Sequence, residues 1–497
     1  MPFRIYEVPS AEKCNEEWQF LLEGRPVPLR EARVSAVPFN RRWPGHQRGL
    51  EQTELVPFAA FELDGPVQVT VKPPGTFQHA IVRPLSKGVV PQTDGRHITF
   101  ALREAGAYTL ELDGHHHALH IFADPPKDYG ITCRHDNTLY FGKGLHEAGM
   151  ITLKSGQTVL IDEGAVVYAC IHAKNADNIK ILGKGILDNS KNQEQILFEL
   201  KKTGDGSVDS GNAKRIHTVQ LEYCNNIEID GITIRDSLVY NIRPVCCNGL
   251  SINNVKLIGN WRFNSDGIDL HNCIHTTIRN CFLRTYDDAI CVKGFDYRHR
   301  ESDRNGGRND YSSMDDVLIE KCVIWCDWGR ALEIGAETRA EEIKNITFRD
   351  CDIIRSTHVA MDVQNVDYAD VHDIVFENIR VEYDPVCQAP AIQGTDQEAF
   401  VEDTNSRYLP ALMSSSILKH HEYSAGGARR GKNHDILFKD IQVTATRMPP
   451  SSFGGYDEAH QTARVKIENL RLNGKKLTTL TEAMIALRPF ANDITIQ

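Results

Sequence analysis

The stretch Ile229-Asp230-Gly231-Ile232-Thr233-Ile234 decides the fold, because its pattern of apolar residues on both sides of a polar corner returns along the chain. It recurs at Ile252–Leu257 and Ile278–Leu283, and then from five later starting positions: Ile319, Phe348, Phe376, Phe438 and Ile467. Successive starts lie 23, 26, 41, 29, 28, 62 and 29 residues apart. A repeat of about 23–29 residues, rich in β-branched side chains, predicts a parallel β-solenoid in which each turn buries its apolar residues against the next.

Two other repeat architectures fit this pattern less well. The apolar residues alternate instead of recurring at helical spacing, which argues against a helical repeat. The leucine-rich signature is absent, although its period is similar. We therefore expect an all-β chain in which residues 126–497 form a parallel β-helix. Insertions are expected near 295–314 and 383–432, and a short helix at Thr481–Arg488.

Residues 1–125 follow a different pattern. Short alternating strands, such as Val67–Lys72 and Ala107–Leu112, are separated by glycine-containing turns. This arrangement is typical of an antiparallel β-sandwich. The prolines of Asp124-Pro125-Pro126 mark a stiff connector to the repeat domain. The aromatic and basic loop around Trp43 either contacts a ligand or packs between the domains, and the sequence leaves both interpretations open.

Composition limits the classes of partner. The chain has 497 residues, a formal net charge of -11 and no basic stripe, so nucleic acid is not expected as a partner. No run of about 18 apolar residues is present, and the first residues lack the apolar core of a secretory signal. The 13 cysteines are odd in number and include no C-x-x-C pair, which favours buried thiols in a reducing compartment. We therefore expect a cytoplasmic protein without membrane association, and a homo-oligomer stays open.

Three aspartates, Asp266, Asp287 and Asp288, stand in two segments separated by 21 residues, which is close to one turn of the expected coil. Residues one turn apart lie about 4.8 Å from each other along such a coil, so Asp266 and Asp287 are expected to be neighbours. A corner or bulge would turn Asp288 to the same side. Clustered carboxylates raise at least one pKa, and glycoside cleavage needs one protonated and one ionised carboxyl. Structural turn residues and calcium ligands are the alternative interpretations, although the spacing of a calcium loop is absent.

The segments NSDGIDL, at Asn264–Leu270, and DDAICVKG, at Asp287–Gly294, resemble the N-[ST]-D-G and D-D signatures of the polygalacturonase-like glycoside hydrolases, family 28. The resemblance covers about residues 139–475. A β-sandwich ahead of a β-helix is similar to the related family 49 of dextranases and isopullulanases. The resemblance implies a right-handed single-stranded β-helix and hydrolysis with inversion at the anomeric carbon.

By this resemblance Asp287 is the general acid, and Asp266 and Asp288 hold and deprotonate the attacking water. The chain departs from the family in the segment Gly329–Gly335, where Arg330 stands in place of the histidine of the usual G-H-G motif. Any influence of that histidine on the acid is therefore expected to be altered.

A second departure concerns the substrate. The R-I-K motif that grips a galacturonate carboxylate is missing, and Asp362 lies where it should be. An acidic residue there repels a uronate, so a neutral sugar is favoured. An α-linked substrate is a further expectation. Arg262, Lys293 and Arg330 could still form an anion pocket by another route.

Further side chains around the acids are expected to contact sugar hydroxyls. On consecutive turns they would continue one cleft, although solvated corner positions are the alternative interpretation for several of them. The long insertion near 383–432 is expected to form a lid or subsite wall. The substrate-binding candidates are Asn264, His271, Lys293, Arg330, Glu333, Glu337, His358, Asp362, Gln364 and Trp43.

The sequence therefore favours a glycosidase that cleaves O-glycosidic bonds of an oligosaccharide or polysaccharide without a metal or organic cofactor. A hydrolase directed at pectin or another uronate polymer is the alternative within this class. A β-helix polysaccharide lyase or epimerase and a non-catalytic carbohydrate-binding solenoid are alternatives from other classes. The three clustered aspartates count against the non-catalytic solenoid.

Overall fold

The computed structural model describes residues 2–36, 49–131, 136–192, 216–295, 311–383, 391–392, 401–402, 408–421, 423–425 and 429–497. The predicted all-β class is confirmed. The described residues form β-strands and three single turns of 3-10 helix, with no α-helix among them. The 3-10 turns are η1 (Leu50–Gln52), η2 (Leu85–Lys87) and η3 (Ser190–Asn192). The described part of the chain also contains no helix that could span a lipid bilayer.

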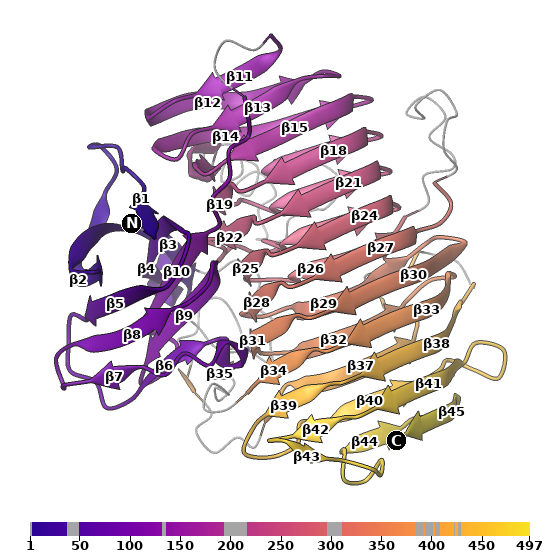
Figure 1. Ribbon diagram of the computed structural model, residues 1–497. Helices are drawn as coiled ribbons and strands as arrows, with labels where there is room; N and C mark the ends of the chain where they lie inside the picture. Colours follow the sequence, from indigo (N-terminus) through magenta and orange to yellow (C-terminus); the bar gives the residue numbers. More distant parts are fainter. Residues whose placement is uncertain are drawn as a thin grey trace.

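The N-terminal part is an antiparallel sandwich made from one ten-stranded sheet that folds around an apolar core (Figure 1). The strand order is β6-β9-β10-β4-β3-β2-β5-β8-β7, with β1 paired to β4. Only β10 and β4 run parallel. Its strands are β1 (Phe3–Ile5), β2 (Cys14–Leu22), β3 (Arg25–Ser35), β4 (Thr53–Leu63), β5 (Val67–Lys72), β6 (Ala80–Arg83), β7 (Gln92–Thr93), β8 (Ile98–Leu102), β9 (Gly106–Leu112) and β10 (Ala118–Asp124).

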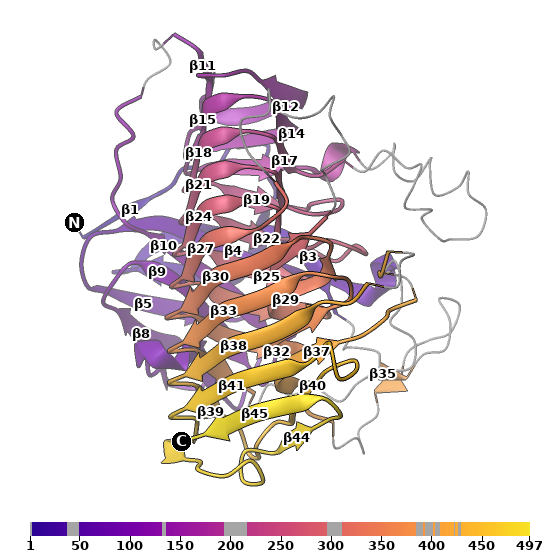
Figure 2. The same ribbon diagram turned by 90° about the vertical axis from the view of Figure 1, so that its right-hand side faces the viewer.

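The C-terminal part is the predicted right-handed parallel β-helix, whose turns stack along one axis (Figures 1 and 2). Each complete turn contributes strands to three parallel ladders. The first ladder is β11 (Thr138–Phe141), β13 (Thr158–Ile161), β15 (Asp177–Gly183), β18 (Asn225–Asp230), β21 (Asn248–Asn253), β24 (Ile274–Arg279), β27 (Asp315–Glu320), β30 (Glu342–Arg349), β33 (Asp370–Glu377), β38 (Lys432–Lys439), β41 (Thr462–Glu468) and β45 (Ala491–Ile496).

The other two ladders share the long strands at the start of the coil, β12 (Gly144–Leu153) and β14 (Ala165–Lys174). One ladder faces the sandwich. It continues through β16 (Ile186–Asp188), β19 (Thr233–Arg235), β22 (Lys256–Ile258), β25 (Phe282–Thr285), β28 (Val323–Cys326), β31 (Asp352–Ser356), β34 (Arg380–Glu382), β39 (Gln442–Thr444) and β42 (Arg471–Leu472), where β43 (Lys475–Lys476) closes a hairpin.

The third ladder carries the candidate site. Its strands after β14 are β17 (Val219–Glu222), β20 (Ile242–Val245), β23 (Ile268–His271), β26 (Ile290–Gly294), β29 (Arg330–Thr338), β32 (Val359–Asn365), β37 (Ala411–Ile417), β40 (Ser451–Gly454) and β44 (Ile485–Leu487).

Apolar columns inside the coil explain the sequence repeat. Phe348, Phe376 and Phe438 occupy the same register position on β30, β33 and β38. Their rings stack with centroids 4.7 and 5.0 Å apart and planes within 5° of parallel. All three are fully buried. Because side chains along a strand alternate between its two faces, the residues directly before and after each phenylalanine point outward.

One corner of the coil explains the Asn and Asp residues that punctuate the repeat. Residues at this corner adopt a left-handed conformation with φ between 52 and 56°, which asparagine and aspartate tolerate better than most residues. Each donates its backbone N–H to a carbonyl of the next turn. The corner residues are Asn254, Asn280, Lys321, Asp350, Asn378, Asp440 and Asn469.

The sandwich packs along the flank of the coil formed by the second ladder (Figure 1). Phe122 of β10 lies 5.0 Å from Phe282 of β25, ring centroid to ring centroid. Beside this apolar contact, Glu111 of β9 accepts hydrogen bonds from Arg83 Nε at 2.9 Å and from Arg355 of β31 at 3.0 Å. The interface between the two parts is therefore both apolar and ion-paired.

Two sequence expectations need correction. Thr481–Arg488 is not a short helix: a single turn ends at Met484, and strand β44 follows. The expected insertion 383–432 contains a regular coil strand, β37, which pairs with β32 and β40. Elsewhere in it the short strands β35 (Ala391–Ile392) and β36 (Val401–Glu402) form a hairpin. Much of this segment and of the 295–314 insertion, including any lid, lies outside the described residues.

Candidate active site

The three predicted aspartates meet on the third ladder, at the corner that leads into β23 and β26. The strand register pairs Ile268 with Ile290, and Gly267 donates its N–H to the carbonyl of Asp288 at 2.8 Å. This backbone register aligns Asp266 with Asp288. The charge of Asp287 nevertheless raises the pKa of Asp266 more than the charge of Asp288 does. Both acids of the corner before β26 therefore lie close to Asp266.

Lys293 binds this group of acids from β26. Its Nζ lies 3.4 Å from a carboxylate oxygen of Asp266, 3.4 Å from Asp269 and 3.9 Å from Asp288. The lysine is itself buried and also lies 5.2 Å from the ring centre of Tyr240. One cation thus holds carboxylates from two consecutive turns.

Arg330, at the start of β29, contacts the same group from the next turn. Its backbone N–H donates to Asp288 Oδ1 at 2.8 Å, and its guanidinium lies 3.8 Å from that oxygen. Its Nε is 3.5 Å from Glu333 and 3.2 Å from Asp362. Gly329 allows this close approach, because a Cβ there would lie 2.4 Å from the Asp288 nitrogen.

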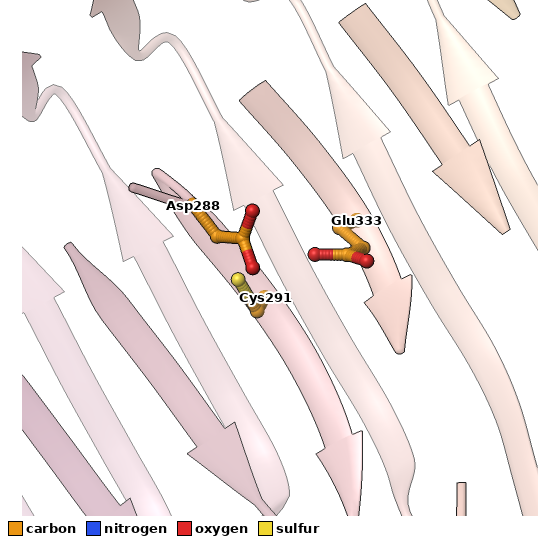
Figure 3. A group of neighbouring side chains, drawn as sticks. All are labelled: Asp288, Cys291 and Glu333. Carbon is orange, nitrogen blue, oxygen red and sulfur yellow. The ribbon is translucent and has the colours of Figure 1, made fainter. Parts of the chain in front are cut away.

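A column of outward side chains runs through four turns beside the aspartates. The register aligns Asp269 of β23, Cys291 of β26, Glu333 of β29 and Asp362 of β32. Figure 3 shows the carboxylates of Asp288 and Glu333 turned toward each other, with the Cys291 sulfur beside them. All four column residues are buried.

The neighbouring carboxyls Asp287 and Asp288 have opposite pKa shifts. Burial, and then the charge of Asp288, raises the pKa of Asp287 well above its usual range. Burial also acts to raise the pKa of Asp288, but the charges of Arg330 and Lys293 outweigh it and lower that pKa. At neutral pH this favours a protonated Asp287 beside an ionised Asp288, which is the pairing that acid–base catalysis needs.

The other carboxyls of the group are shifted upward. Burial, followed by the charges of Asp269 and Asp287, raises the pKa of Asp266 well above the usual range. Burial, followed by the charge of Asp288, does the same to Glu333. Burial raises the pKa of Asp362 even though Arg330 opposes it. Six carboxyls cannot all ionise in so small a volume.

An aromatic surface lies next to the acids. The rings of Tyr286 and Trp328 stack with centroids 5.5 Å apart and planes 8° from parallel, and Phe263 approaches Trp328 at 6.4 Å. Trp328 is half-buried, so part of its indole faces outward. Apolar ring faces of this kind complement the C–H face of a sugar.

The remaining sequence candidates lie around the group rather than in it. His271 is buried and stacks on Phe295 at 4.6 Å, and Glu337 is half-buried and acts on the pKa of Tyr240. The side chains of Asn264, His358 and Gln364 are half-buried. Trp43 lies outside the described residues.

Sequence reasoning missed three residues of the site. Asp269 and Cys291 alternate with the buried Ile268 and Val292 along their strands, so strand periodicity alone could have placed them outward. Trp328 stands one turn after the Asp287 corner, where Gly329 donates its N–H to the carbonyl of Tyr286 at 3.1 Å. No signal in a single sequence marks that position.

A cavity of about 1350 Å³ lies elsewhere, between the edge of the sandwich and a corner of the coil. Gln68 and Lys87 line it from the sandwich, and Asn253, Asn280 and Arg380 line it from the coil. None of the clustered carboxyls borders it. The cavity is therefore separate from the cluster of carboxyls, which is the candidate active site.

Comparison with known proteins supports the family resemblance that the aspartate motifs suggested. The sequence profile described as glycosyl hydrolases family 28 matches residues 134–386, just over half of the chain. The chain belongs to this family. The resemblance drawn from the NSDGIDL and DDAICVKG segments is thereby confirmed. The matched region contains all six clustered carboxyls.

Individual relatives of this family 28 chain are distant. A probable polygalacturonase of Vitis vinifera is 27% identical over 178 residues, which are 31% of this chain and 36% of the relative. The chain thus matches about a third of that relative's length. Among solved structures, the family 28 exopolygalacturonase of Yersinia enterocolitica is 14% identical with a TM-score of 0.52, over 86% of this chain and 96% of that one. Dex49A from Penicillium minioluteum is 14% identical with a TM-score of 0.55, over 99% of this chain and 96% of that one, and this likeness extends to the sandwich.

The cations that the sequence offered for a uronate carboxylate are already paired in this family 28 chain. Lys293 and Arg330 bind the clustered carboxyls, and Arg262 pairs with Asp236. Asp362, for its part, is ion-paired with Arg330 and buried. It does not present the lone negative charge on which the expectation of a neutral sugar rested.

Proposed function

We propose that this chain hydrolyses glycosidic bonds in galacturonate-containing, pectin-type chains by acid–base catalysis. The observation that carries the proposal is the pair Asp287 and Asp288, adjacent carboxyls with opposite pKa shifts on the wall of a family 28 β-helix. One carboxyl is suited to give a proton and the other to take one.

In the proposed reaction, Asp287 gives its proton to the glycosidic oxygen as the bond to the anomeric carbon breaks. Asp288 takes a proton from a water molecule, whose oxygen attacks that carbon from the opposite face. Asp266, held by Lys293 and beside Asp288, positions the water. The sum is the addition of one water across the bond with inversion, and proton exchange with solvent restores both carboxyls.

The substrate class rests on the relatives rather than on the described cations. Proteins similar to this chain carry the names polygalacturonase and exopolygalacturonase. The sequence argument for a neutral sugar depended on the charge of Asp362, and its ion pair with Arg330 removes that argument. The half-buried Trp328, which stacks on the buried Tyr286, offers a surface for the sugar ring next to the acid.

The first experiment compares substrates. Purified chain is incubated with polygalacturonate, with short oligogalacturonides and with dextran as a neutral control, and new reducing ends are measured. We expect release from a galacturonate substrate and none from dextran. Proton NMR of the first product should show the inverted anomer. Release from dextran alone would restore the neutral-sugar hypothesis, and an unsaturated product absorbing in the ultraviolet would indicate a lyase.

The second experiment tests the acid. Asp287→Asn keeps the size of the side chain and removes its proton, so turnover should fall by about 10²-fold or more, the usual contribution of general acid catalysis. Asp236→Asn, in the carboxylate paired with Arg262 outside the group, is the matched control and should retain activity. Near-normal turnover in Asp287→Asn would contradict the assigned role.

The cytoplasmic location and the oligomeric state stay predictions, to be checked by fractionation and by light scattering.

A further inference from the structure

Three side chains of the site form a compact group of potential metal ligands. One carboxylate oxygen each of Asp288 and Glu333 and the Sγ of Cys291 all lie within 4.8 Å of one another. Figure 3 shows them converging from the corner before β26, from β26 itself and from β29. Among the described residues, no other three such atoms form a group of this kind.

Glu333 is the member that most needs a partner. It is fully buried, and neither of its carboxylate oxygens accepts a hydrogen bond from a described residue. Its ion pair with Arg330 is long, with 3.5 Å between Nε and Oε1. Ionising a carboxyl buried in this way is costly, so a cation bound beside it would stabilise its charged form.

Carboxyls also outnumber cations around this group of ligands. The ion pairs of the described residues bring two cations, Lys293 and Arg330, to this region. Six carboxyls form ion pairs with these two cations or lie beside one that does: Asp266, Asp269, Asp287, Asp288, Glu333 and Asp362. Because six carboxyls cannot all ionise beside two cations, a bound cation can take the place of a proton in this group.

We propose that Asp288, Cys291 and Glu333 form a binding site for a thiophilic divalent cation of the zinc class, and that its occupation inhibits the enzyme. A thiolate with two carboxylates is a ligand set that Zn²⁺ accepts, whereas Mg²⁺ and Ca²⁺ prefer oxygen ligands alone. Water can complete the coordination from the side of Asp288, the one ligand with measurable exposure, at 7%.

The group needs only a small contraction to bind zinc. Zn–S and Zn–O bond lengths place the ligand atoms of a tetrahedral site about 3.5 Å apart, so the present spacing must shrink by about 1 Å. Rotation about side-chain bonds can supply this. Binding also displaces the Cys291 thiol proton to solvent, along with any proton shared between Asp288 and Glu333.

Inhibition follows from which residue the cation occupies, and this part rests on the proposed function. A metal bound to Asp288 neutralises the carboxylate that is assigned to deprotonate water. Metal binding itself can be measured without substrate, so the site and the proposed hydrolysis can fail separately.

The test uses Co²⁺ as a spectroscopic probe on the purified full chain. Thiolate ligation gives a sulfur-to-cobalt charge-transfer band in the near ultraviolet, and we expect this band to saturate at one equivalent per chain and to disappear on adding Zn²⁺. Cys291→Ser should abolish the band. Glu333→Gln keeps the thiol and should weaken Co²⁺ binding by about 10- to 100-fold, a loss that even outer-shell metal partners cause.

The matched control addresses the other buried thiols. Cys281, Cys322 and Cys351 interact with one another inside the coil, and a soft cation could find them after partial unfolding. Cys322→Ser should leave the cobalt band unchanged. Circular dichroism of each variant establishes that the coil is intact.

Two results would overturn the proposal. One is a folded wild-type chain that shows no thiolate band at saturating Co²⁺. The other is a band that survives in Cys291→Ser or disappears in Cys322→Ser, since the ligand would then be a different cysteine. Where hydrolysis is measurable, micromolar-range Zn²⁺ should inhibit the wild type but not Cys291→Ser. Equal inhibition of both would show that Zn²⁺ does not inhibit by binding at this site.

Discussion

Asp287 and Asp288 are adjacent in the chain, yet their surroundings give them opposite protonation. Both are buried, so desolvation alone would raise the pKa of each. The difference between the two pKa shifts comes from Arg330. Its backbone N–H donates to Asp288 Oδ1, and its guanidinium lies close to the same oxygen. Arg330, which the sequence suggested as a replaced histidine and a substrate contact, is therefore the main charge that keeps the proposed base ionised.

This arrangement predicts the pH dependence of activity. Activity needs Asp288 ionised and is lost as pH falls through its lowered pKa; it needs Asp287 protonated and is lost as pH rises through its raised pKa. Arg330→Gln removes the cation from Asp288, so the acidic limb of the kcat/KM profile should move up by about one to three pH units. Arg330→Lys keeps the charge and should restore most of the wild-type limb. A superimposable profile for Arg330→Gln would show that Arg330 does not tune the base.

The site could be predicted from the sequence in part. The aspartate motifs were visible because they carry a family signature, but the backbone register of the corner, which aligns Asp266 with Asp288, was not. Register at a corner depends on how many residues the turn takes up, and the separation of 21 residues does not reveal that. Asp269 and Cys291 acquire their meaning only from the column that four turns build together.

At the scale of strands, the apolar columns determine the fold. The repeat starting at Phe348, Phe376 and Phe438 places one ring per turn in register, so the ring of Phe376 contacts the rings of the turns before and after it. This is why the coil could be predicted from one sequence: strand alternation and a recurring corner are local signals. The strand β37 was missed because the sequence on either side of it shows no repeat, which hides its spacing.

The stack of rings predicts the effect of removing one. Phe376→Ala should lower the free energy of unfolding by about 3–5 kcal/mol, since two neighbouring rings lose their contact and a cavity remains. Val375→Ala, one residue earlier on the outer face, should cost about 1 kcal/mol or less. Urea unfolding followed by circular dichroism compares the two variants. Equal losses would mean that the inward column is not the main source of stability here.

For the molecule as a whole, the sandwich and the coil share a continuous interface. Phe122 and Phe282 contact across it, and Glu111 joins Arg83 of the sandwich to Arg355 of the coil. These three charged side chains are almost completely buried. The sequence predicted both parts, but not their contact, because nothing in either repeat pattern specifies which flank of the coil is covered.

The buried network predicts a stability effect across the interface. Glu111→Gln removes the carboxylate that pairs with the buried Arg355 and leaves Arg83 with Glu382, so the free energy of unfolding should fall by about 3–5 kcal/mol. Glu104→Gln breaks only the exposed pair with Lys87 and should change it by less than about 1 kcal/mol. Differential scanning calorimetry should show the loss for Glu111→Gln, together with separation of the two parts into distinct transitions. A Tm equal to that of Glu104→Gln would count against a structural role for the network.

The column from Asp269 to Asp362 has a consequence for how such a chain can change over generations. Each site residue occupies one position in a hydrogen-bonded ladder, and adjacent positions on a strand face opposite sides. Deleting a single residue within β26 or β29 would turn the rest of that strand inside out. Added loop residues cost little, because closure entropy rises slowly with length. Heritable variation that preserves activity is therefore confined to the loops between strands, and new substrate preferences should arise there while the carboxyl column stays fixed.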